Sequence, residues 1–221
     1  MHFKRITILA GHYGSGKTIV AVNLAFTLKK SYENVVIADA DIVNPYFRTK
    51  DSESELEKAG IRLICSKYAN SNVDIPARPQ ELYAVTDDKT IRAVMDIGGD
   101  DRGAYALGRF SHMIAEEDDY EMLAVVNMYR PLSKTPELAA DILKEIEAAA
   151  KLKFTGIVNN SNLGKDTRTE DIFKSLSYAE DISKIMGIPV KMTCVKKDLY
   201  DSVKEKIKNV YPLTLQKNIL S

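Results

Sequence analysis

A phosphate-binding loop near the N-terminus constrains the fold of this chain more than any other feature. Gly11–Thr18 reads G-H-Y-G-S-G-K-T, which fits the pattern G-x-x-x-x-G-K-[ST]. The loop follows the apolar run Ile6–Ala10 and precedes the helix-like segment Ile19–Ala25. In this setting the backbone N–H groups of the loop and the start of the helix surround an anion. The pattern predicts a nucleoside triphosphate site; the alternative is a glycine-rich surface turn.

The chemistry of phosphate binding assigns roles to the residues of this loop. We expect Lys17 to reach the β and γ phosphates and the Thr18 hydroxyl to ligate Mg²⁺. Glycines let the backbone curl so that successive N–H groups point inward. The residues expected to contact the nucleotide are Gly11, His12, Tyr13, Gly14, Ser15, Gly16, Lys17, Thr18 and Ile19.

Strand-like and helix-like segments alternate along the whole chain. Apolar, β-branched runs predict strands at 4–9, 35–38, 61–65, 91–97, 122–127, 154–159 and 188–193. Helices are predicted at 17–30, 104–116, 136–151, 169–186 and 199–208. Thr135 marks the start of one helix and Gly187 the end of another. We therefore expect an α/β fold with a mostly parallel, twisted sheet and helices on both faces, formed by a single domain over residues 1–221.

Composition excludes several classes of function. Lys plus Arg and Asp plus Glu total 31 each, so the formal net charge is zero. A general nucleic-acid binder would have a basic excess. Cys65 and Cys194 lack the C-x-x-C spacing of a metal or redox site, and we expect them to fill the core. No apolar run is long enough to span a bilayer, so we expect a cytoplasmic protein that does not bind membranes.

Two acids follow the predicted strand at 35–38, in the run A-D-A-D. The carboxyl ends of parallel strands meet at the edge where the phosphate loop lies. Asp39 and Asp41 are therefore expected to face the γ-phosphate, where they hold Mg²⁺ through water and orient the attacking water. The alternative is that these acids only cap the following turn.

A third acid ends the predicted strand at 91–97, in the run M-D-I-G-G. Asp96 is expected to support Mg²⁺ at the same edge. Gly98 and Gly99 can bring a backbone N–H group close to the γ-phosphate and change conformation when that phosphate leaves. The alternative is a Gly-Gly turn that simply closes the strand.

The order of these motifs resembles the MinD/ParA/CobQ/CobB group of P-loop ATPases, which also includes the nitrogenase iron protein. The resemblance extends over residues 4–195. It implies a mainly parallel sheet of seven or eight strands, binding of ATP with Mg²⁺, and slow hydrolysis coupled to dimerisation. It also implies that an Asn after a late strand contacts adenine, with Asn159 the first candidate and Asn160 the second. An Asn in an ordinary strand-to-loop turn is the alternative.

The chain departs from this group at the start of the loop. Members usually read K-G-G-x-G-K-T there, and the first Lys reaches the nucleotide of a partner across a dimer. Here His12 and Tyr13 occupy those places, and His is shorter than Lys and largely neutral at pH 7. Neither cysteine stands where a shared iron–sulfur cluster would be expected, which argues against electron transfer.

Three further segments have two readings each. Arg130 is either an exposed loop residue, which we favour, or a source of positive charge for phosphate or an acidic partner. The aromatic residues of Asn44–Arg48 form either core or a nucleotide-dependent interaction surface. The segment Asp198–Asn209 is expected to pack on the sheet rather than lie on a membrane.

The sequence thus predicts an ATPase that acts as a nucleotide-driven switch on a protein partner and that forms a homodimer in one nucleotide state. One alternative is a metabolic enzyme that phosphorylates a carboxylate, related to dethiobiotin synthetase and CobQ. The other is a nucleotide-binding adaptor that does not hydrolyse. ATP is preferred over GTP by resemblance, since the chain contains no N-K-x-D guanine motif.

Overall fold

The chain folds around one parallel sheet. The computed structural model describes residues 1–39, 52–64, 85–98 and 101–214. Within these residues eight strands form a sheet in the order β3-β2-β4-β1-β5-β6-β7-β8, and every neighbouring pair is parallel. The strands are β1 Ile6–Ala10, β2 Val35–Asp39, β3 Arg62–Ile64, β4 Arg92–Asp96, β5 Tyr120–Val126, β6 Gly156–Asn159, β7 Val190–Lys196 and β8 Val210–Leu213. The predicted α/β class with a parallel sheet is confirmed.

The strand order reverses at β1. The chain first builds β2, β3 and β4 on one side of β1, and then adds β5 to β8 in sequence on the other side. Ligands of open parallel sheets bind outside the strand ends at such a reversal. Gly11–Thr18 follows β1 directly, so the topology places the predicted phosphate loop at this point.

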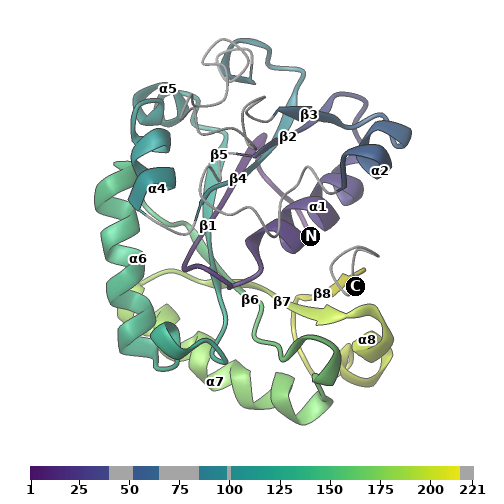
Figure 1. Ribbon diagram of the computed structural model, residues 1–221, viewed down its shortest axis with the longest axis vertical. Helices are drawn as coiled ribbons and strands as arrows, with labels where there is room; N and C mark the ends of the chain where they lie inside the picture. The colour runs from purple at the N-terminus through teal and green to yellow at the C-terminus, as the bar shows by residue number, and fades with distance from the viewer. Residues whose placement is uncertain (40–51, 65–84, 99–100, 215–221) are drawn as a thin grey trace, which may run out of the picture.

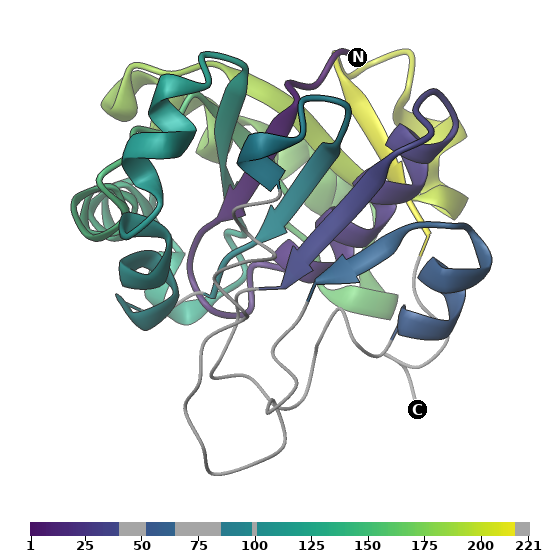
Figure 2. The same ribbon diagram turned by 90° about the horizontal axis from the view of Figure 1, so that it is seen from above.

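Helices cover both faces of the sheet, with α1 and α2 on one face and α4 to α7 on the other (Figures 1 and 2). They are α1 Lys17–Lys29, α2 Glu53–Lys58, α4 Asp101–Gly108, α5 Ser111–Glu116, α6 Pro136–Ala150, α7 Thr169–Met186 and α8 Lys197–Val203, with short 3₁₀ turns η2 Pro131–Ser133 and η3 Gly164–Asp166. None of the helices in the described part of the chain is long and apolar enough to cross a membrane.

Alternation along the strands creates a separate core on each face, because successive side chains point to opposite sides. Ile6 and Ile8 of β1 pack on one face with Leu143 of α6. Leu9 packs on the other face with Leu24 of α1. The central strand is therefore buried on both sides, and its C-terminal end is held rigidly where the phosphate loop begins.

The predicted helix ends are confirmed at two places. Thr135 caps α6, and its hydroxyl accepts a hydrogen bond from the Leu138 backbone N–H at 3.4 Å. Gly187 ends α7 with φ of 69°, a backbone conformation that glycine adopts without strain.

Two helix predictions are wrong in extent. The segment expected to form one helix at 104–116 forms two helices, α4 and α5, because the chain turns after Gly108. The turn lies close against α6, since a Cβ on Gly108 would lie 2.6 Å from the Ala149 carbonyl oxygen. The helix expected at 199–208 begins at Lys197 and ends at Val203. The segment still packs as expected, since Val203 and Ile207 are buried against Val195 of β7.

Helix α2 and the edge strand β8 were not among the elements predicted from the sequence. β8 contains Pro212, which cannot donate to a strand ladder and is tolerated at a sheet edge. It is held by long-range contacts, since Thr214 and Asn23 of α1 exchange two hydrogen bonds of 2.8 and 3.1 Å. Of the strand predicted at 61–65, Cys65 lies outside the described residues.

A buried ion pair at the N-terminal ends of the strands anchors the segment that leads into β4. Arg5 is 4% exposed and donates through Nη1 to the carbonyl oxygens of Val85 and Ile91 at 2.8 and 3.1 Å. Its Nε donates to Glu117 Oε1 at 2.7 Å, and Lys89 pairs with the second Glu117 oxygen. Since β4 carries Asp96, this pair helps to fix one wall of the predicted site.

Glu117 makes the stability of this anchor depend on pH. Burial would raise the pKa of Glu117, but hydrogen bonds from Arg5 and Lys89 outweigh it and hold the pKa below the ordinary value of 4.5. The stabilising contribution is therefore complete above pH 4.5 and is lost as the pH falls through the lowered folded-state pKa.

Replacing Glu117 by Gln should lower the free energy of unfolding at neutral pH, because Arg5 loses its buried counter-charge. The difference from the wild type should shrink as the pH falls below 4.5 and through the lowered folded-state pKa of Glu117, because the wild-type carboxylate then becomes protonated as well. Urea unfolding at several pH values measures it. Glu116→Gln, at an exposed neighbouring position, is the control; identical pH profiles for the two variants would contradict the prediction.

Candidate functional site: a phosphate loop at the sheet edge

The Gly11–Thr18 loop has the backbone geometry of an anion cradle. Gly14 and Gly16 have φ of 76° and 87°, and Gly16 directly precedes the first residue of α1. The turn is closed by a 3.1 Å hydrogen bond from the Ser15 N–H to the His12 carbonyl oxygen. The free N–H groups and the positive dipole end of α1 therefore meet at this loop.

Two of the glycines are required by close contacts as well as by conformation. A Cβ on Gly11 would lie 2.3 Å from the Val125 carbonyl oxygen of β5. A Cβ on Gly16 would lie 2.3 Å from Nδ2 of Asn160. The loop therefore passes so close to β5 and to the end of β6 that side chains at these two positions are excluded.

The Thr18 hydroxyl joins the start of α1 to the end of β4. Thr18 Oγ1 donates to Asp96 Oδ2 at 2.6 Å, a short distance typical of a hydroxyl bonded to a carboxylate. Asp96 is 1% exposed. Lys17 is also buried, and its Nζ donates to the His12 carbonyl oxygen at 3.3 Å.

Asp39 lies beside Asp96. The two are Cα partners at the ends of the neighbouring parallel strands β2 and β4, and Asp39 is 8% exposed. Two buried carboxylates next to a threonine hydroxyl form a set of oxygen donors that suits Mg²⁺. Within the described residues no group of three or more His, Cys, Asp or Glu side chains could hold a metal, so water or phosphate oxygens would have to complete the coordination.

The structure describes only some of the other residues that were predicted to hold Mg²⁺ or to respond to the γ-phosphate. Gly98 follows Ile97, whose N–H donates to the Leu9 carbonyl oxygen at 3.0 Å, so the chain continues alongside β1. A Cβ on Gly103 of α4 would lie 2.7 Å from the Gly98 nitrogen, which places α4 directly against this segment. Asp41, Gly99 and the aromatic residues of the segment 44–48 lie outside the described residues.

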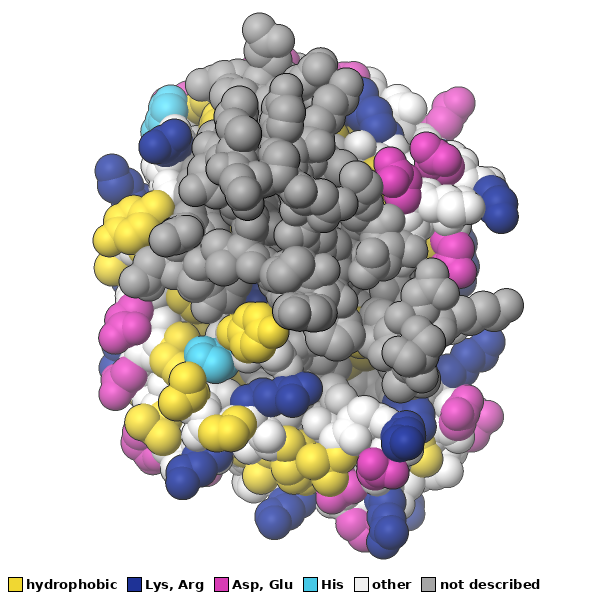
Figure 3. Space-filling model, viewed as in Figure 1, with side chains coloured by type: hydrophobic (Ala, Val, Ile, Leu, Met, Phe, Trp, Pro, Cys, Tyr) yellow, Lys and Arg dark blue, Asp and Glu magenta, His cyan; other side chains and the backbone are white. Residues whose placement is uncertain are grey.

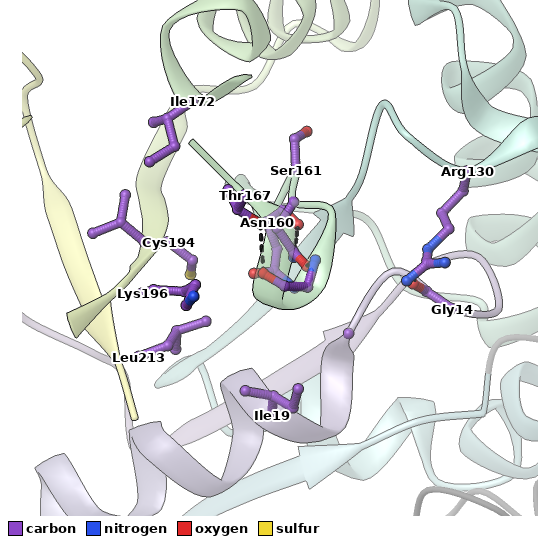
Figure 4. A pocket seen from close by; sticks show the side chains of 14 residues that line it. Gly14, Ile19, Arg130, Asn160, Ser161, Thr167, Ile172, Cys194, Lys196 and Leu213 are labelled. Carbon is purple, nitrogen blue, oxygen red and sulfur yellow. Dashed lines mark hydrogen bonds between the residues drawn. The ribbon is translucent and has the colours of Figure 1, made fainter. Parts of the chain in front are cut away.

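A cleft of about 80 Å³ opens beside the loop, between α1 and the ends of β6 and β7 (Figure 4). Ile19 and Gly16 line its α1 side. The remaining lining residues are Gly14, Arg130, Asn160, Ser161, Asn162, Gly164, Thr167, Ile172, Cys194, Val195, Lys196 and Leu213. Burial raises the pKa of the Cys194 thiol, which keeps the thiol protonated and agrees with its predicted place in the core.

The two candidate asparagines occupy different environments. Asn159 is fully buried; its Nδ2 donates to Ser175 Oγ at 2.9 Å, and its Oδ1 accepts from the Ser161 N–H at 3.2 Å. Asn160 lines the cleft and donates to the Ser15 carbonyl oxygen at 2.7 Å. The geometry thus favours the second candidate, Asn160, for contact with a ligand, while Asn159 joins β6 to α7.

The loops around the cleft are connected by hydrogen bonds that the sequence did not predict. Asn127 Oδ1 accepts from the N–H groups of Tyr129 and Asn162 at 3.0 and 3.3 Å. Arg130 Nε donates to the Gly14 carbonyl oxygen at 2.7 Å. Arg130 is exposed, as expected, yet it contacts the phosphate loop, which the favoured interpretation did not include. The only local signal was Asn127 directly after β5, with Arg130 in the turn that follows it.

Several large apolar side chains are exposed on the loops at this edge of the sheet. Tyr13 of the phosphate loop is 55% exposed, Leu132 of η2 is 64% exposed and Leu163 is 46% exposed. In the view of Figure 3, hydrophobic side chains gather on the lower part of the molecule, with basic and acidic side chains around them. The surroundings of the cleft therefore offer both apolar area and positive charge.

Several solved structures share the fold. FtsY from Thermotoga maritima superposes with a TM-score of 0.58 at 19% identity, over 86% of this chain and 61% of that chain. The signal recognition particle receptor FtsY from Elizabethkingia anophelis, in complex with GDP, gives a TM-score of 0.54 at 18% identity, over 99% and 62%. The 54 kDa signal recognition particle protein from Aeropyrum pernix, also in complex with GDP, gives 0.53 at 18%, over 85% and 40%. The chain thus spans between 40% and 62% of these proteins, and at such identities the likeness concerns the fold alone.

The comparison with curated proteins found no match. The family comparison did: residues 6–192 match the CobQ/CobB/MinD/ParA nucleotide binding domain. The match includes the phosphate loop, Asp39, Asp96 and both asparagines at the end of β6. The chain therefore belongs to the CobQ/CobB/MinD/ParA family of nucleotide-binding domains.

Proposed function

We propose that this chain binds ATP with Mg²⁺, hydrolyses it slowly, and uses the change of nucleotide to control a protein partner. The observation that carries the proposal is the 2.6 Å contact between Thr18 Oγ1 and Asp96 Oδ2 beside the phosphate loop. A hydroxyl at the start of a helix and a carboxylate at a strand end are the pair that flanks Mg²⁺ in nucleotide hydrolysis by P-loop proteins.

The described residues fit a phosphate chain. Ser15 Oγ and His12 Nδ1 are buried, and neither has a hydrogen-bond partner within the part of the chain that the structure describes. Buried polar atoms of this kind call for a water or a ligand. Thr18, Asp96 and Asp41 are the proposed residues of the Mg²⁺ site, and Mg²⁺ would supply charge neutralisation on the phosphate oxygens.

The protein groups act by placement and charge. Lys17 and the loop N–H groups stabilise the negative charge that develops on the phosphate oxygens. Asp39 and Asp41 orient a water in line with the γ-phosphate. The new bond joins the water oxygen to the γ-phosphorus as the bond to the β-phosphate oxygen breaks, which yields ADP and inorganic phosphate. Gly98 and Gly99 would report the loss of the γ-phosphate to α4, against which Gly98 packs.

Replacing Lys17 by Ala should weaken ATP binding about 100-fold, because a charge-assisted contact to phosphate is lost. Thr18→Ala should remove the Mg²⁺ dependence of binding and turnover, whereas Thr18→Ser keeps the hydroxyl and should retain both. Calorimetry with ATP and GTP, with and without Mg²⁺, and a phosphate-release assay measure these effects. Wild-type affinity in Lys17→Ala would contradict the proposal, and a preference for GTP, since two structures of the same fold hold GDP, would overturn its ATP part.

Asn160→Ala should weaken nucleotide binding by about tenfold, because the Ser15 peptide loses its donor and the cleft loses a polar group. Asn159→Ala should instead lower the free energy of unfolding by about 1–3 kcal/mol, because the buried hydrogen bonds of the Asn159 side chain to Ser175 and to the Ser161 N–H are lost. Parallel measurements of nucleotide affinity and urea unfolding separate the two effects. The reverse pattern would return the nucleotide contact to Asn159.

The exposed apolar side chains around the cleft support the proposal that a protein partner binds at the C-terminal ends of the strands. A second copy of the chain is the simplest such partner. Light scattering should then show a dimer with ATP and a monomer with ADP, and Lys17→Ala should stay monomeric with ATP. Burying side chains such as Tyr13 and Leu132 drives the association. A monomer in every nucleotide state would contradict the dimer and leave a different protein as the partner.

A further inference from the structure

Arg130 lies in a turn whose backbone is held by hydrogen bonds before and after it. Its N–H donates to the Asn127 carbonyl oxygen at 3.2 Å, and its own carbonyl oxygen accepts from the Ser133 N–H at 3.1 Å. Ser133 Oγ also donates to the Asn127 carbonyl oxygen at 3.2 Å. Pro131 follows Arg130 and fixes its own φ. Few backbone states are therefore open to Arg130, and its side chain leaves the turn in a defined direction.

This turn is bonded to the other loop of the cleft. Asn127, at 1% exposure, accepts from the Asn162 N–H, and the Met128 N–H donates to Ser161 Oγ at 3.0 Å. The same Asn160–Asn162 segment donates to the Ser15 carbonyl oxygen through Asn160. The phosphate loop, the turn after β5 and the loop after β6 thus form one hydrogen-bonded unit.

The guanidinium of Arg130 uses only part of its donor capacity on the protein. Nε donates to the Gly14 carbonyl oxygen at 2.7 Å. No hydrogen bond from Nη1 or Nη2 is found among the described residues, although the guanidinium carries four N–H groups there in a planar fork. Figure 4 shows Arg130 with Gly14 on one side of Asn160, and Lys196 with Cys194 on the other side. Lys196 donates to the Lys165 carbonyl oxygen, so the two basic side chains lie at opposite ends of the cleft.

We propose that Arg130 is a second cation of the phosphate site, whose Nε holds the Gly14 peptide while its terminal N–H groups donate to phosphate oxygens of the bound nucleotide. The inference rests on the proposed nucleotide-binding function and deepens it. A guanidinium suits this task because its charge is permanent and its fork matches phosphate oxygens. Since the turn is already fixed, little conformational entropy is lost when the contact forms.

The test compares Arg130→Gln and Arg130→Lys with Lys134→Gln, which removes an exposed charge from the same loop but does not line the cleft. ATP affinity is measured by calorimetry over a range of salt concentrations, and urea unfolding checks that each variant is folded. Arg130→Gln should bind ATP about tenfold more weakly at low salt, with a shallower dependence of affinity on salt, because a charged contact is missing. Arg130→Lys should recover part of the affinity and the wild-type salt dependence, and Lys134→Gln should match the wild type.

Two results would overturn the assignment. Wild-type affinity in Arg130→Gln would show that Arg130 does not contribute, and a loss of affinity with unchanged salt dependence would show that Arg130 only supports Gly14. Lys17→Ala separates this failure from failure of the proposed function. If Lys17→Ala loses ATP while Arg130→Gln does not, only the role of Arg130 is wrong; if Lys17→Ala binds ATP as the wild type does, the proposed function is wrong.

Discussion

The hydrogen bond between Thr18 and Asp96 joins the two halves of the site. Asp96 is almost completely buried, and burying a carboxylate is costly unless it is hydrogen-bonded or paired. The Thr18 hydroxyl at 2.6 Å provides one such bond, and the N-terminal end of α1 provides a favourable field. The contact therefore fixes α1 against β4, and it sets the position of the phosphate loop relative to the acids at the ends of β2 and β4.

The same loop is held from outside through its carbonyl groups. The carbonyl oxygen and the following N–H group of a peptide point in opposite directions. When Asn160 holds the Ser15 carbonyl oxygen at 2.7 Å, the Gly16 N–H is turned to the opposite side of the chain. Arg130 acts in the same way on the Gly14 carbonyl oxygen, and the N–H of that peptide bonds to the His12 carbonyl oxygen. Asn160 thus orients the Gly16 N–H toward the side that an anion would occupy, whereas Arg130 supports the turn that the Ser15 N–H closes.

Local signals predicted the fold, whereas distant contacts decided the details of the site. The phosphate loop, α7 and the cap at Thr135 are each encoded within a few neighbouring residues, and the structure has them where the sequence predicted. The choice between Asn159 and Asn160 could not be made in this way, because successive residues at a strand end face opposite sides. Only distant contacts show that Asn159 bonds to Ser175 of α7 while Asn160 lines the cleft. β8 was missed because Pro212 weakens the strand pattern, and Asn23 and Thr27 of α1, which bond to it, are more than a hundred positions away. The contact of Arg130 with Gly14 spans 116 positions and has no local signature.

The position of Arg130 also bears on what a second copy of the chain would contribute to the site. Members of the MinD and ParA group usually have a Lys at the position that His12 occupies here, and that Lys brings positive charge to the nucleotide of the partner. His12 occupies that place in this chain, so the charge of that Lys is missing. Arg130 comes from the turn after β5 of the same chain and contacts the phosphate loop of that chain, so no second copy is needed to place it there. If it supplies the missing charge, a second copy is not needed for charge neutralisation. Its contribution would be to cover exposed side chains such as Tyr13 and to exclude water, so dimerisation would regulate access to the nucleotide rather than complete its charge environment.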